Sequence, residues 1–442
     1  MSKRRHHREQ PAFPFPFGTN VQEPSAGSVI AAELQQDIGP ALVQLLAEVE
    51  SWLEAPATNR RLWTDFPDLH ALPAELATRA GRTFELLREE SDQHTQEAVA
   101  LALVWTGEWI ETEGGAIRAA IVFHQAALLL LPDNVPLPYH IGRLLRQVAM
   151  YDDAEAWLLH TADKAAAAGN WQHHALALSG TGNLKRERGN FPESVRFHRM
   201  ALDSARKHGV RRLEGDALYD LAVMHFERGE LDEGMRHARE AINAYGPGHS
   251  QLVRMANDLG WIWMHLHGEA GLALTLFQAI EPRVQDPAFR CVLLANITRA
   301  AAEVEQEHIY ELGWLETYGY MRKQDTEDGH AAAFCQLALA ALASTQLERA
   351  RQAASLCMDV AQRRRETHSI YMASQILDAL KNGLPAPAEM KELFPAFTLD
   401  EVEVNPVQME RDEDFVAALG IAVRTRRDGA PESPVRALIR GK

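Results

Sequence analysis

The residues in this chain with the widest possible chemical roles are its 19 histidines. Three sequence arrangements could in principle bind a metal ion: the pair His173–His174, His265 and His267 around a leucine, and the ExxH sequence from Glu305 to His308. In carboxylate-bridged metal bundles the ExxH spacing occurs twice, together with further glutamates. Because no second ExxH stands at an equivalent position, we predict no metal site and interpret these histidines as surface or inter-helix packing residues.

Short catalytic and nucleotide-binding motifs are absent from the sequence. There is no GxxxxGK[ST] phosphate loop, no GxGxxG after a strand, no HExxH and no GxSxG. We therefore predict that the chain is not an enzyme and that it uses no cofactor.

Composition and charge describe an acidic globular chain. Its 442 residues carry a formal net charge of −16, and an acidic body repels a phosphate backbone, so we expect no nucleic-acid partner. The longest apolar run, residues 119–131, is too short to span a bilayer, and the N-terminus lacks the apolar segment of a secretory signal. Three scattered cysteines suit a reducing compartment. We expect a cytoplasmic protein without a membrane partner.

An internal repeat indicates the elements that position the polar side chains. Residues 188–202 (RGNFPESVRFHRMAL) and 228–242 (RGELDEGMRHAREAI) share an Arg-Gly start and a glutamate five residues after the arginine. Turn positions recur every 35 to 40 residues, at Gly114, Ala149, Gly189, Gly229 and Gly268.

Small residues flank each of these turns. Before the turns stand Gly107, Gly142, Gly182, Ala222 and, one residue further out, Gly260; after them stand Ala119, Ala154, Ser194, Gly234 and Ala273. Small residues on facing helices allow the two helices of a hairpin to approach closely.

At these positions the chain resembles the tetratricopeptide repeat (TPR) family, whose units are helix, turn, helix. The unit at 106–132 places Gly107, Ala119, Phe123, Ala126 and Pro132 where the family does. The period of about forty residues exceeds the family's usual length of about thirty-four, and such long units resemble those of bacterial regulators and adaptor arrays. The resemblance implies an all-α fold, a right-handed α-solenoid of TPR units with an N-terminal helical cap and flexible ends.

The predicted domain boundaries follow from this resemblance. We expect a disordered basic tail over 1–27, a helical cap over 28–92, a solenoid of about seven units over 93–385 and a charged tail over 386–442. Residues 28–56 and 74–91 have the pattern of amphipathic helices, the first kinked at Pro40. The units at 291–320 and 338–362 are degenerate. Each tail is either a solvated linker or a segment that docks on the array or on a partner.

The resemblance also implies a binding surface, because in TPR proteins the first helix of each unit lines the concave face. The family's ligand-contacting positions carry over to Trp105, Glu108, Glu111, Tyr139, His140, Arg143, Arg146, Asn183, Arg186, Glu187, Tyr219, Asp220, Phe226, Glu227, Asn257, Asp258, Trp261, Met264 and His265. Among these we predict that the partner-binding residues are Tyr139, Arg143, Arg146, Asn183, Arg186, Tyr219, Asn257, Trp261 and His265.

Two groups within this surface are notable. The first comprises Arg143, Arg146, Asn183 and Arg186, which would form a basic, amide-bearing patch. Arginine offers paired donors to a carboxylate, and asparagine can both donate to and accept from a peptide backbone. The second is the stretch from Gly260 to His267, whose Trp261, Met264 and His265 would line a pocket wall. Solvated face residues are the alternative for the first group, and core packing is the alternative for the second.

These observations predict a non-catalytic scaffold or adaptor that binds a peptide segment of a protein partner in the concave TPR groove. Two alternatives remain open from the sequence. One is a peptide- or signal-responsive TPR regulator without its own DNA-binding domain, and the other is a subunit of an enzyme complex. The chain could also form a homo-oligomer.

Overall fold

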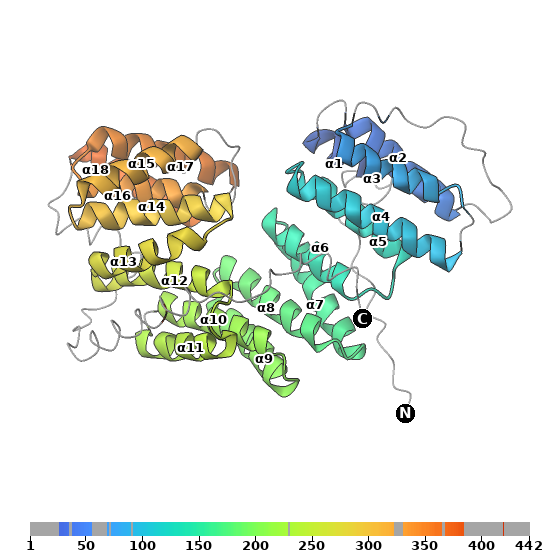
Figure 1. The fold of residues 1–442 in the computed structure, drawn as a ribbon, viewed down its shortest axis with the longest axis horizontal. Helices are drawn as coiled ribbons and strands as arrows, with labels where there is room; N and C mark the ends of the chain where they lie inside the picture. Colours follow the sequence, from blue (N-terminus) through green and yellow to red (C-terminus); the bar gives the residue numbers. More distant parts are fainter. Residues whose placement is uncertain are drawn as a thin grey trace. The chain divides into compact units, whose positions relative to one another are not determined.

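The described part of the computed structural model is built from helices connected by short turns (Figure 1). It comprises residues 26–34, 38–54, 69, 72–89, 92–228, 230–321, 330–364, 367–383 and 419. No residue in these ranges belongs to a β-strand. The two predicted tails lie outside the described residues, apart from Ala26, Gly27 and the isolated Leu419.

Three helices precede the repeats: α1 (Ala26–Glu33), α2 (Gly39–Glu54) and α3 (Ala74–Leu86). The predicted single helix kinked at Pro40 is wrong, because α1 ends at Glu33 and Pro40 instead stands in the first turn of α2. Proline suits that position, since its fixed φ is helical and its missing N–H has no intrahelical partner there. A carboxylate oxygen of Glu33 accepts a hydrogen bond from the backbone N–H of Ala119 at 3.0 Å, which ties α1 to the start of α5.

Seven helix hairpins follow within the described residues. The pairs are α4 (Gln93–Thr112) with α5 (Ile117–Leu130), α6 (Pro136–Gln147) with α7 (Tyr151–Ala167), α8 (Trp171–Glu187) with α9 (Phe191–Lys207), α10 (Arg211–Glu227) with α11 (Leu231–Tyr245), α12 (Gln251–Ile262) with α13 (Ala270–Ile280), α14 (Pro287–Glu303) with α15 (Glu307–Met321), and α16 (His330–Ala343) with α17 (Leu347–Arg364). A 3₁₀ turn η3 (Glu281–Arg283) follows α13, and α18 (Thr367–Asn382) follows the last hairpin.

The turn inside a hairpin ends on a residue with left-handed backbone geometry. In the predicted turns, φ is 59° at Ala149, 74° at Gly189 and 69° at Gly268. In the first hairpin the left-handed residue is Gly115, one position after the predicted Gly114. The same geometry at Glu305 and Thr345 confirms that the degenerate segments also form hairpins.

Close contacts at the small residues hold the hairpins together. A Cβ atom at Gly142 would lie 3.0 Å from Cγ of Leu158, and one at Gly182 would lie 2.7 Å from Cε1 of His198. Since both partner side chains come from the second helix of the same hairpin, a larger residue on the first helix would push the two helices apart. This is the packing that the sequence pattern predicted.

One irregularity explains the shifted spacing of the fifth hairpin. Its small residue, Gly260, stands one position further from the turn than in the other hairpins. The structure continues α12 with one π-helical turn, η2 (Trp263–His267). A π turn absorbs one inserted residue within a helix, so the hairpin keeps its close contact, with Phe277 facing Gly260.

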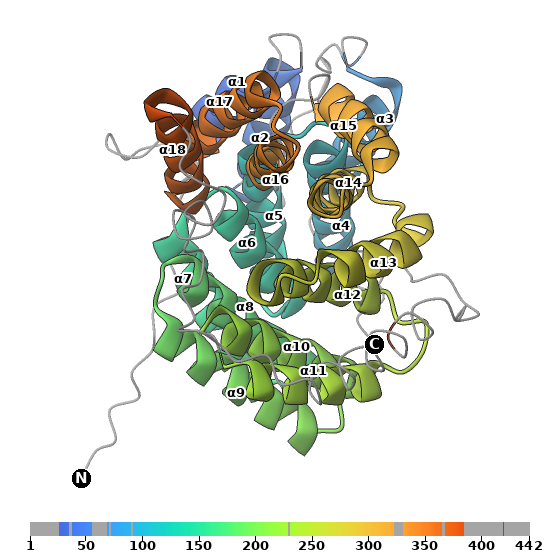
Figure 2. The same cartoon turned by 90° about the vertical axis from the view of Figure 1, so that its left-hand side faces the viewer.

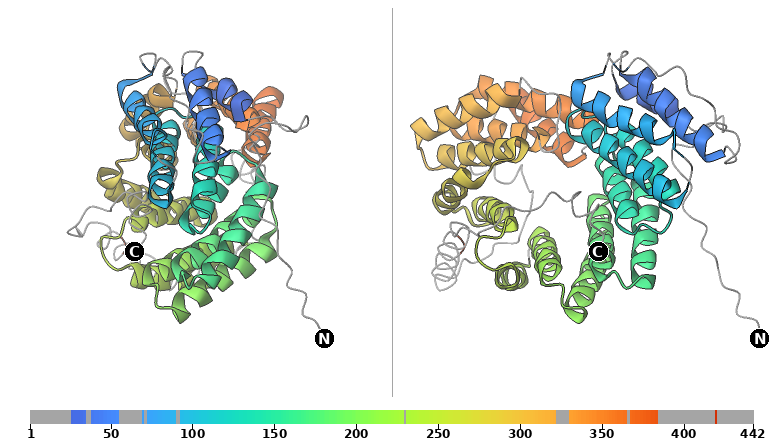
Figure 3. Two further views of the ribbon diagram at one scale, coloured as in Figure 1. Left: turned by 90° about the vertical axis from the view of Figure 1, so that its right-hand side faces the viewer. Right: turned by 45° about the vertical axis from the view of Figure 1, so that its right-hand side comes forward.

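The described chain divides into two compact units within α10. The first includes the described residues up to Ala217, and the second those from Leu218 to Leu419. In the first unit α1 packs on α2 and α5, and α2 and α3 precede α4 in the same stack (Figure 3). In the second unit α14 and α16, the first helices of two consecutive hairpins, pack side by side (Figure 2).

The predicted fold class is confirmed: the protein is an all-α solenoid of TPR-like helix-turn-helix units. Alanine, leucine and glycine at the facing positions fill the interior between helices, and Ala119, Ala154 and Ala273 are all buried. Among the described helices, none combines the length and the apolar character needed to cross a bilayer.

Candidate functional site

Polar side chains of the first helices form the candidate site. In both compact units they pair with side chains from the first helix of a neighbouring hairpin, and we call these contacts the inter-repeat pairs. In the first unit they are His140–Glu111, Arg143–Glu111 and Arg146–Glu187. In the second unit they are Tyr219–Asp258, Asn296–Asn257, Arg299–His265 and Arg299–Gln336.

Glu111 at the end of α4 is the centre of the first-unit pairs. Its two carboxylate oxygens contact Nε2 of His140 at 3.0 Å and a guanidinium nitrogen of Arg143 at 2.9 Å. Burial raises the pKa of Glu111, but the hydrogen bonds and charges of His140 and Arg143 outweigh burial and lower the pKa to about 2. Glu111 is therefore ionised throughout the physiological range.

The pKa of Glu108, one turn earlier on α4, is shifted in the opposite direction. Burial and the charge of Glu111 raise its pKa to about 7, although the charge of Arg79 opposes them. The guanidinium of Arg79 lies over the ring of Trp105, 4.6 Å from the ring centroid, and Trp105 remains partly exposed. Near neutral pH the Glu108 carboxyl group at this end of the surface is therefore partly protonated and partly ionised.

Two of the three arginines in the predicted basic patch have carboxylate partners. Arg143 is paired with Glu111, and Arg146 is paired with Glu187 of α8. Each guanidinium is therefore neutralised by a carboxylate from the adjacent hairpin. Asn183 and Arg186 lie on α8, as predicted, and both are half-buried. The surface presents alternating charges and amides, because residues one repeat apart bring opposite charges together.

In the second unit an amide pair links α12 to α14. The side-chain nitrogen of Asn296 donates to the side-chain oxygen of Asn257 at 2.9 Å, and Asn257 donates in turn to Asp258 at 3.1 Å. Asp258 also accepts a hydrogen bond from the hydroxyl of Tyr219 on α10. Burial, followed by the charge of Asp258, raises the pKa of Tyr219 well above its usual value, so the hydroxyl remains a donor.

His265 on η2 anchors the last group of contacts. Its ring stacks on Trp261 with 4.0 Å between centroids, and its Nδ1–H donates to the Trp261 carbonyl at 2.9 Å. A guanidinium N–H of Arg299 donates to Nε2 of His265, and the same nitrogen of Arg299 donates to Gln336 at 2.9 Å. Burial and the charge of Arg299 lower the pKa of His265 well below its usual value, so the ring is neutral.

Not every predicted surface residue lies on this face. Phe226 is buried against Gly234 of α11, and Met264, in the π turn η2, is also buried. Asn257 is also buried, and it contributes to the site through its partners. Tyr139, Asp220 and Trp261 are partly exposed, whereas the side chain of Glu227 lies outside the described residues.

Sequence reasoning missed the partners on α14 and α16, namely Asn296, Arg299 and Gln336. These residues fall in degenerate repeats, where no family positions were carried over. A usable signal exists, since Asn257 and Asn296 are separated by one repeat length. Sequence reasoning also missed His124 on α5, which lies 4.6 Å from the ring centroid of His140 and could join it and Glu111 in holding a metal ion.

The histidine pair on α8 behaves as the sequence predicted. Nδ1 of His173 contacts the side-chain oxygen of Asn170 at 3.1 Å, and Nδ1 of His174 contacts the hydroxyl of Ser204 on α9 at 2.8 Å. The ring of His173 also packs edge-on against Tyr139 of α6, so His174 packs within its own hairpin and His173 packs between two adjacent hairpins.

Comparison with known proteins gives likenesses of fold. No family model matches the chain, and no curated protein matches it. Three solved structures are similar: the Rap conjugation gene regulator of plasmid pLS20 in complex with the Phr* peptide, the TPR2AB domain of yeast Sti1 in its pHSP90 complex, and the P58(IPK) TPR domain. Each is 12% identical, with TM-scores of 0.42, 0.24 and 0.21. The matches cover 85%, 64% and 69% of this chain and 98%, 99% and 99% of the other chains.

The hairpins, their left-handed turns and their small facing residues define a TPR-like helical repeat protein. Sequence identity at this level concerns the fold alone, so the ligands of those three proteins do not transfer to this chain.

Proposed function

We propose that this chain is a non-catalytic scaffold that binds an extended peptide segment of a partner protein along the first helices of its hairpins. The observation that carries the proposal is the set of inter-repeat pairs, which hold polar side chains in fixed positions on the first helices, some of them partly exposed, such as Arg143 and Arg146. Donors and acceptors that are already ordered lose little side-chain entropy when a ligand binds. A peptide backbone, with its alternating N–H and C=O groups, is the ligand that fits such a surface.

The charges of the surface favour a peptide over a purely anionic ligand. Arg143 and Arg146 are each paired with a carboxylate, so the face of α6 and α8 offers both signs of charge. A strongly acidic ligand would have to displace Glu111 and Glu187 from their arginines. We infer that the partner contributes amide groups and mixed charges. We also infer that the chain acts in a reducing compartment such as the cytoplasm, because its three cysteines are buried thiols.

A peptide-library selection tests the proposal. Peptides selected by the full chain are expected to bind the double variant Asn183→Ala/Arg186→Ala at least about tenfold more weakly, since lost hydrogen bonds to charged groups cost about 1.5–3 kcal/mol each. Fluorescence anisotropy with a labelled peptide measures the difference.

The matched control lies on the second helix of the same hairpin. Arg196 and Arg199 on α9 are exposed, and their double alanine variant should bind the same peptides as the unmodified chain does. If both double variants bind equally well, or if no peptide is selected, the proposed surface is wrong.

A further inference from the structure

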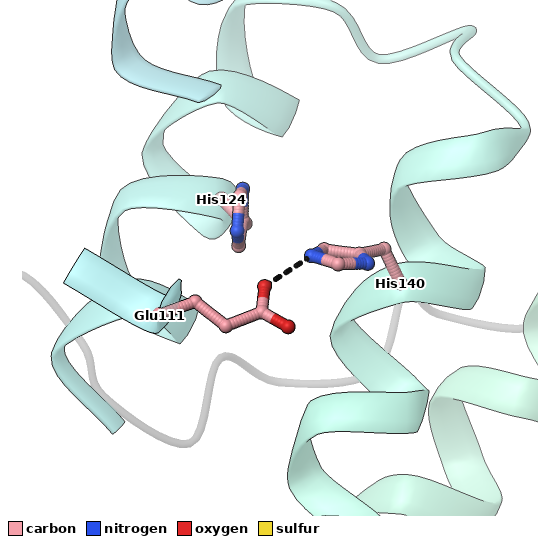
Figure 4. Close-up of side chains that lie close together, drawn as sticks. All are labelled: Glu111, His124 and His140. Carbon is pink, nitrogen blue, oxygen red and sulfur yellow. Dashed lines mark hydrogen bonds and ion pairs between the residues drawn. The ribbon is translucent and has the colours of Figure 1, made fainter. Parts of the chain in front are cut away.

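The inference concerns three side chains at the junction of the first two hairpins. Glu111 lies in the last turn of α4, His124 lies in the middle of α5 and His140 lies in α6 (Figure 4). One carboxylate oxygen and one nitrogen from each ring all lie within 4.8 Å of one another. Within the described residues no other group of three or more such side chains has this spacing.

His124 is the unusual member of the group. It is fully buried, yet neither of its ring nitrogens has a hydrogen-bond partner in the described structure. Buried polar groups nearly always have a partner, and one without a partner calls for an explanation such as an absent ion. Phe123 and Ala126 in the same helix are apolar and equally buried, so an apolar residue at position 124 would fill the space without that cost.

The backbone also makes room for this imidazole. A Cβ atom at Gly107 would lie 2.9 Å from Cε1 and 3.2 Å from Nε2 of His124. Only a residue without a side chain at position 107 allows the ring to lie against α4, where it faces His140 edge-on at 4.6 Å between centroids. The glycine, which the repeat requires for close helix packing, thus also places a nitrogen lone pair beside Glu111.

We propose that Glu111, His124 and His140 form a binding site for a divalent transition-metal ion such as Zn²⁺, with water as the fourth ligand. Two imidazoles and one carboxylate are a ligand set that Zn²⁺ accepts with tetrahedral geometry. With metal–ligand bonds of about 2.1 Å, ligand atoms in such a site are about 3.4 Å apart. The contact between Glu111 and His140, at 3.0 Å, already lies near this separation, and no ligand-atom distance, at 4.8 Å or less, has to shorten by more than about 1.4 Å. Rotation of the partly exposed Glu111 side chain assists this approach.

Arg143 has to move for the ion to bind. It donates to Glu111 at 2.9 Å and contacts Nδ1 of His140 at 3.3 Å, which leaves the proton of His140 on Nε2, facing Glu111. Metal binding through Nε2 requires that proton to shift to Nδ1, and the guanidinium then has to leave Nδ1. The Arg143 side chain is 34% exposed, so it can turn toward solvent.

This displacement gives a prediction that a merely structural network would not make. Removing the guanidinium by Arg143→Gln removes both a positive charge and a competitor for Glu111, so Zn²⁺ should bind several-fold more tightly. Removing the ligand by His124→Asn should weaken binding by about tenfold or more. In a purely structural cluster, neither substitution would change metal affinity.

The experiment uses the full untagged chain carrying His6→Gln and His7→Gln, so that the adjacent N-terminal histidines cannot bind the probe. Zn²⁺ affinity and stoichiometry are measured by isothermal titration calorimetry with a competing chelator, and Co²⁺ replaces Zn²⁺ to report geometry through its visible absorption. His198→Asn is the matched control, because His198 is another fully buried histidine that faces a glycine, Gly182, but no carboxylate cluster.

We expect a single Zn²⁺ per chain, weaker binding for His124→Asn, tighter binding for Arg143→Gln and unchanged binding for His198→Asn. The proposal is overturned if the background chain binds no Zn²⁺, if His124→Asn binds it equally well, or if Arg143→Gln weakens binding. Circular dichroism checks that each variant is folded. Should His124→Asn fail to fold, the direction of the Arg143→Gln effect decides.

Discussion

Replacing Gly182 with alanine is expected to destabilise the first compact unit by about 2 kcal/mol. The new Cβ would lie 2.7 Å from Cε1, 2.8 Å from Nε2 and 2.9 Å from Nδ1 of His198, so it would press against the face of that ring. His198 on α9 is fully buried against α8, so relief of this contact requires a shift within the core. Alanine is favoured over glycine in a helix by about 1 kcal/mol, so the steric cost has to exceed that gain.

Urea unfolding followed by circular dichroism measures this effect, and a glycine in another helix provides the control. Gly81 lies inside α3, where an added Cβ would meet only Leu69 at an ordinary 3.6 Å. Gly81→Ala should therefore stabilise the same unit by about 0.5–1 kcal/mol. Opposite signs for the two variants support the close-packing explanation, whereas equal stabilisation would contradict it.

A double variant isolates the contact itself. His198→Ala vacates the space that the Gly182→Ala methyl group needs, so the two substitutions together should cost less than the sum of their separate effects. Coupling of about 0.5–3 kcal/mol is typical of residues in direct contact. Additive effects would mean that Gly182 is required for another reason.

The second large effect is a loss of stability at acidic pH. The stability of the second compact unit is expected to fall as the pH is lowered from about 7 to 5, because it buries neutral histidines. Burial lowers the pKa of His237 to about 4, with help from the charges of Arg236 and His225 and against those of Glu240 and Glu233. An unfolded histidine has a pKa of about 6.5.

The sign follows from which state binds more protons. Between about pH 6.5 and pH 4 the unfolded chain is protonated at His237 and the folded chain is not, so acid favours unfolding. The contribution is fully present above pH 6.5 and is lost as the pH falls toward 4. At pH 5 the loss of stability from His237 amounts to at most about 2 kcal/mol, and solvent screening of the ring reduces it. His265 adds to the loss in the same direction, because its pKa is also lowered.

Urea unfolding at pH 7.5 and pH 5.0 measures the loss in the unmodified chain and in His237→Gln. The variant should lose about 1–2 kcal/mol less than the unmodified chain over this interval. His308→Gln, on the exposed face of α15, is the control and should retain the original pH dependence. An identical loss in all three proteins would show that His237 does not sense this acid range.

Much of the fold was predictable because its signal is repeated. Gly142 and Gly182, with the turns at Ala149 and Gly189, recur at nearly constant spacing, and each is required by a close contact or a left-handed φ. The break between α1 and α2 was not predictable in this way, because no repeat constrains it. The apolar spacing of that region equally fits one long helix.

The site was predictable only in part, for a physical reason. Helical periodicity identifies which residues of the first helices share a face, and it placed Glu111, Arg143 and His265 correctly on first helices. Helical periodicity does not show which side chains of the next repeat face these residues. The sequence alone therefore predicts a basic patch and not the carboxylates that pair with its arginines. Met264 lies in a π turn, which local sequence preference does not reveal, and it is buried rather than exposed on this face.

The inter-repeat pairs also limit how this protein can change. In many repeat proteins a whole unit can be duplicated or deleted, since each neighbour presents much the same surface. Here Asn257 pairs with Asn296 and Arg146 pairs with Glu187, in each case across adjacent repeats. Deleting one of these repeats would leave amide and charged side chains of the neighbouring repeat without partners. Substitutions should therefore accumulate in matched pairs one repeat apart, and the order of the repeats along the chain should be fixed.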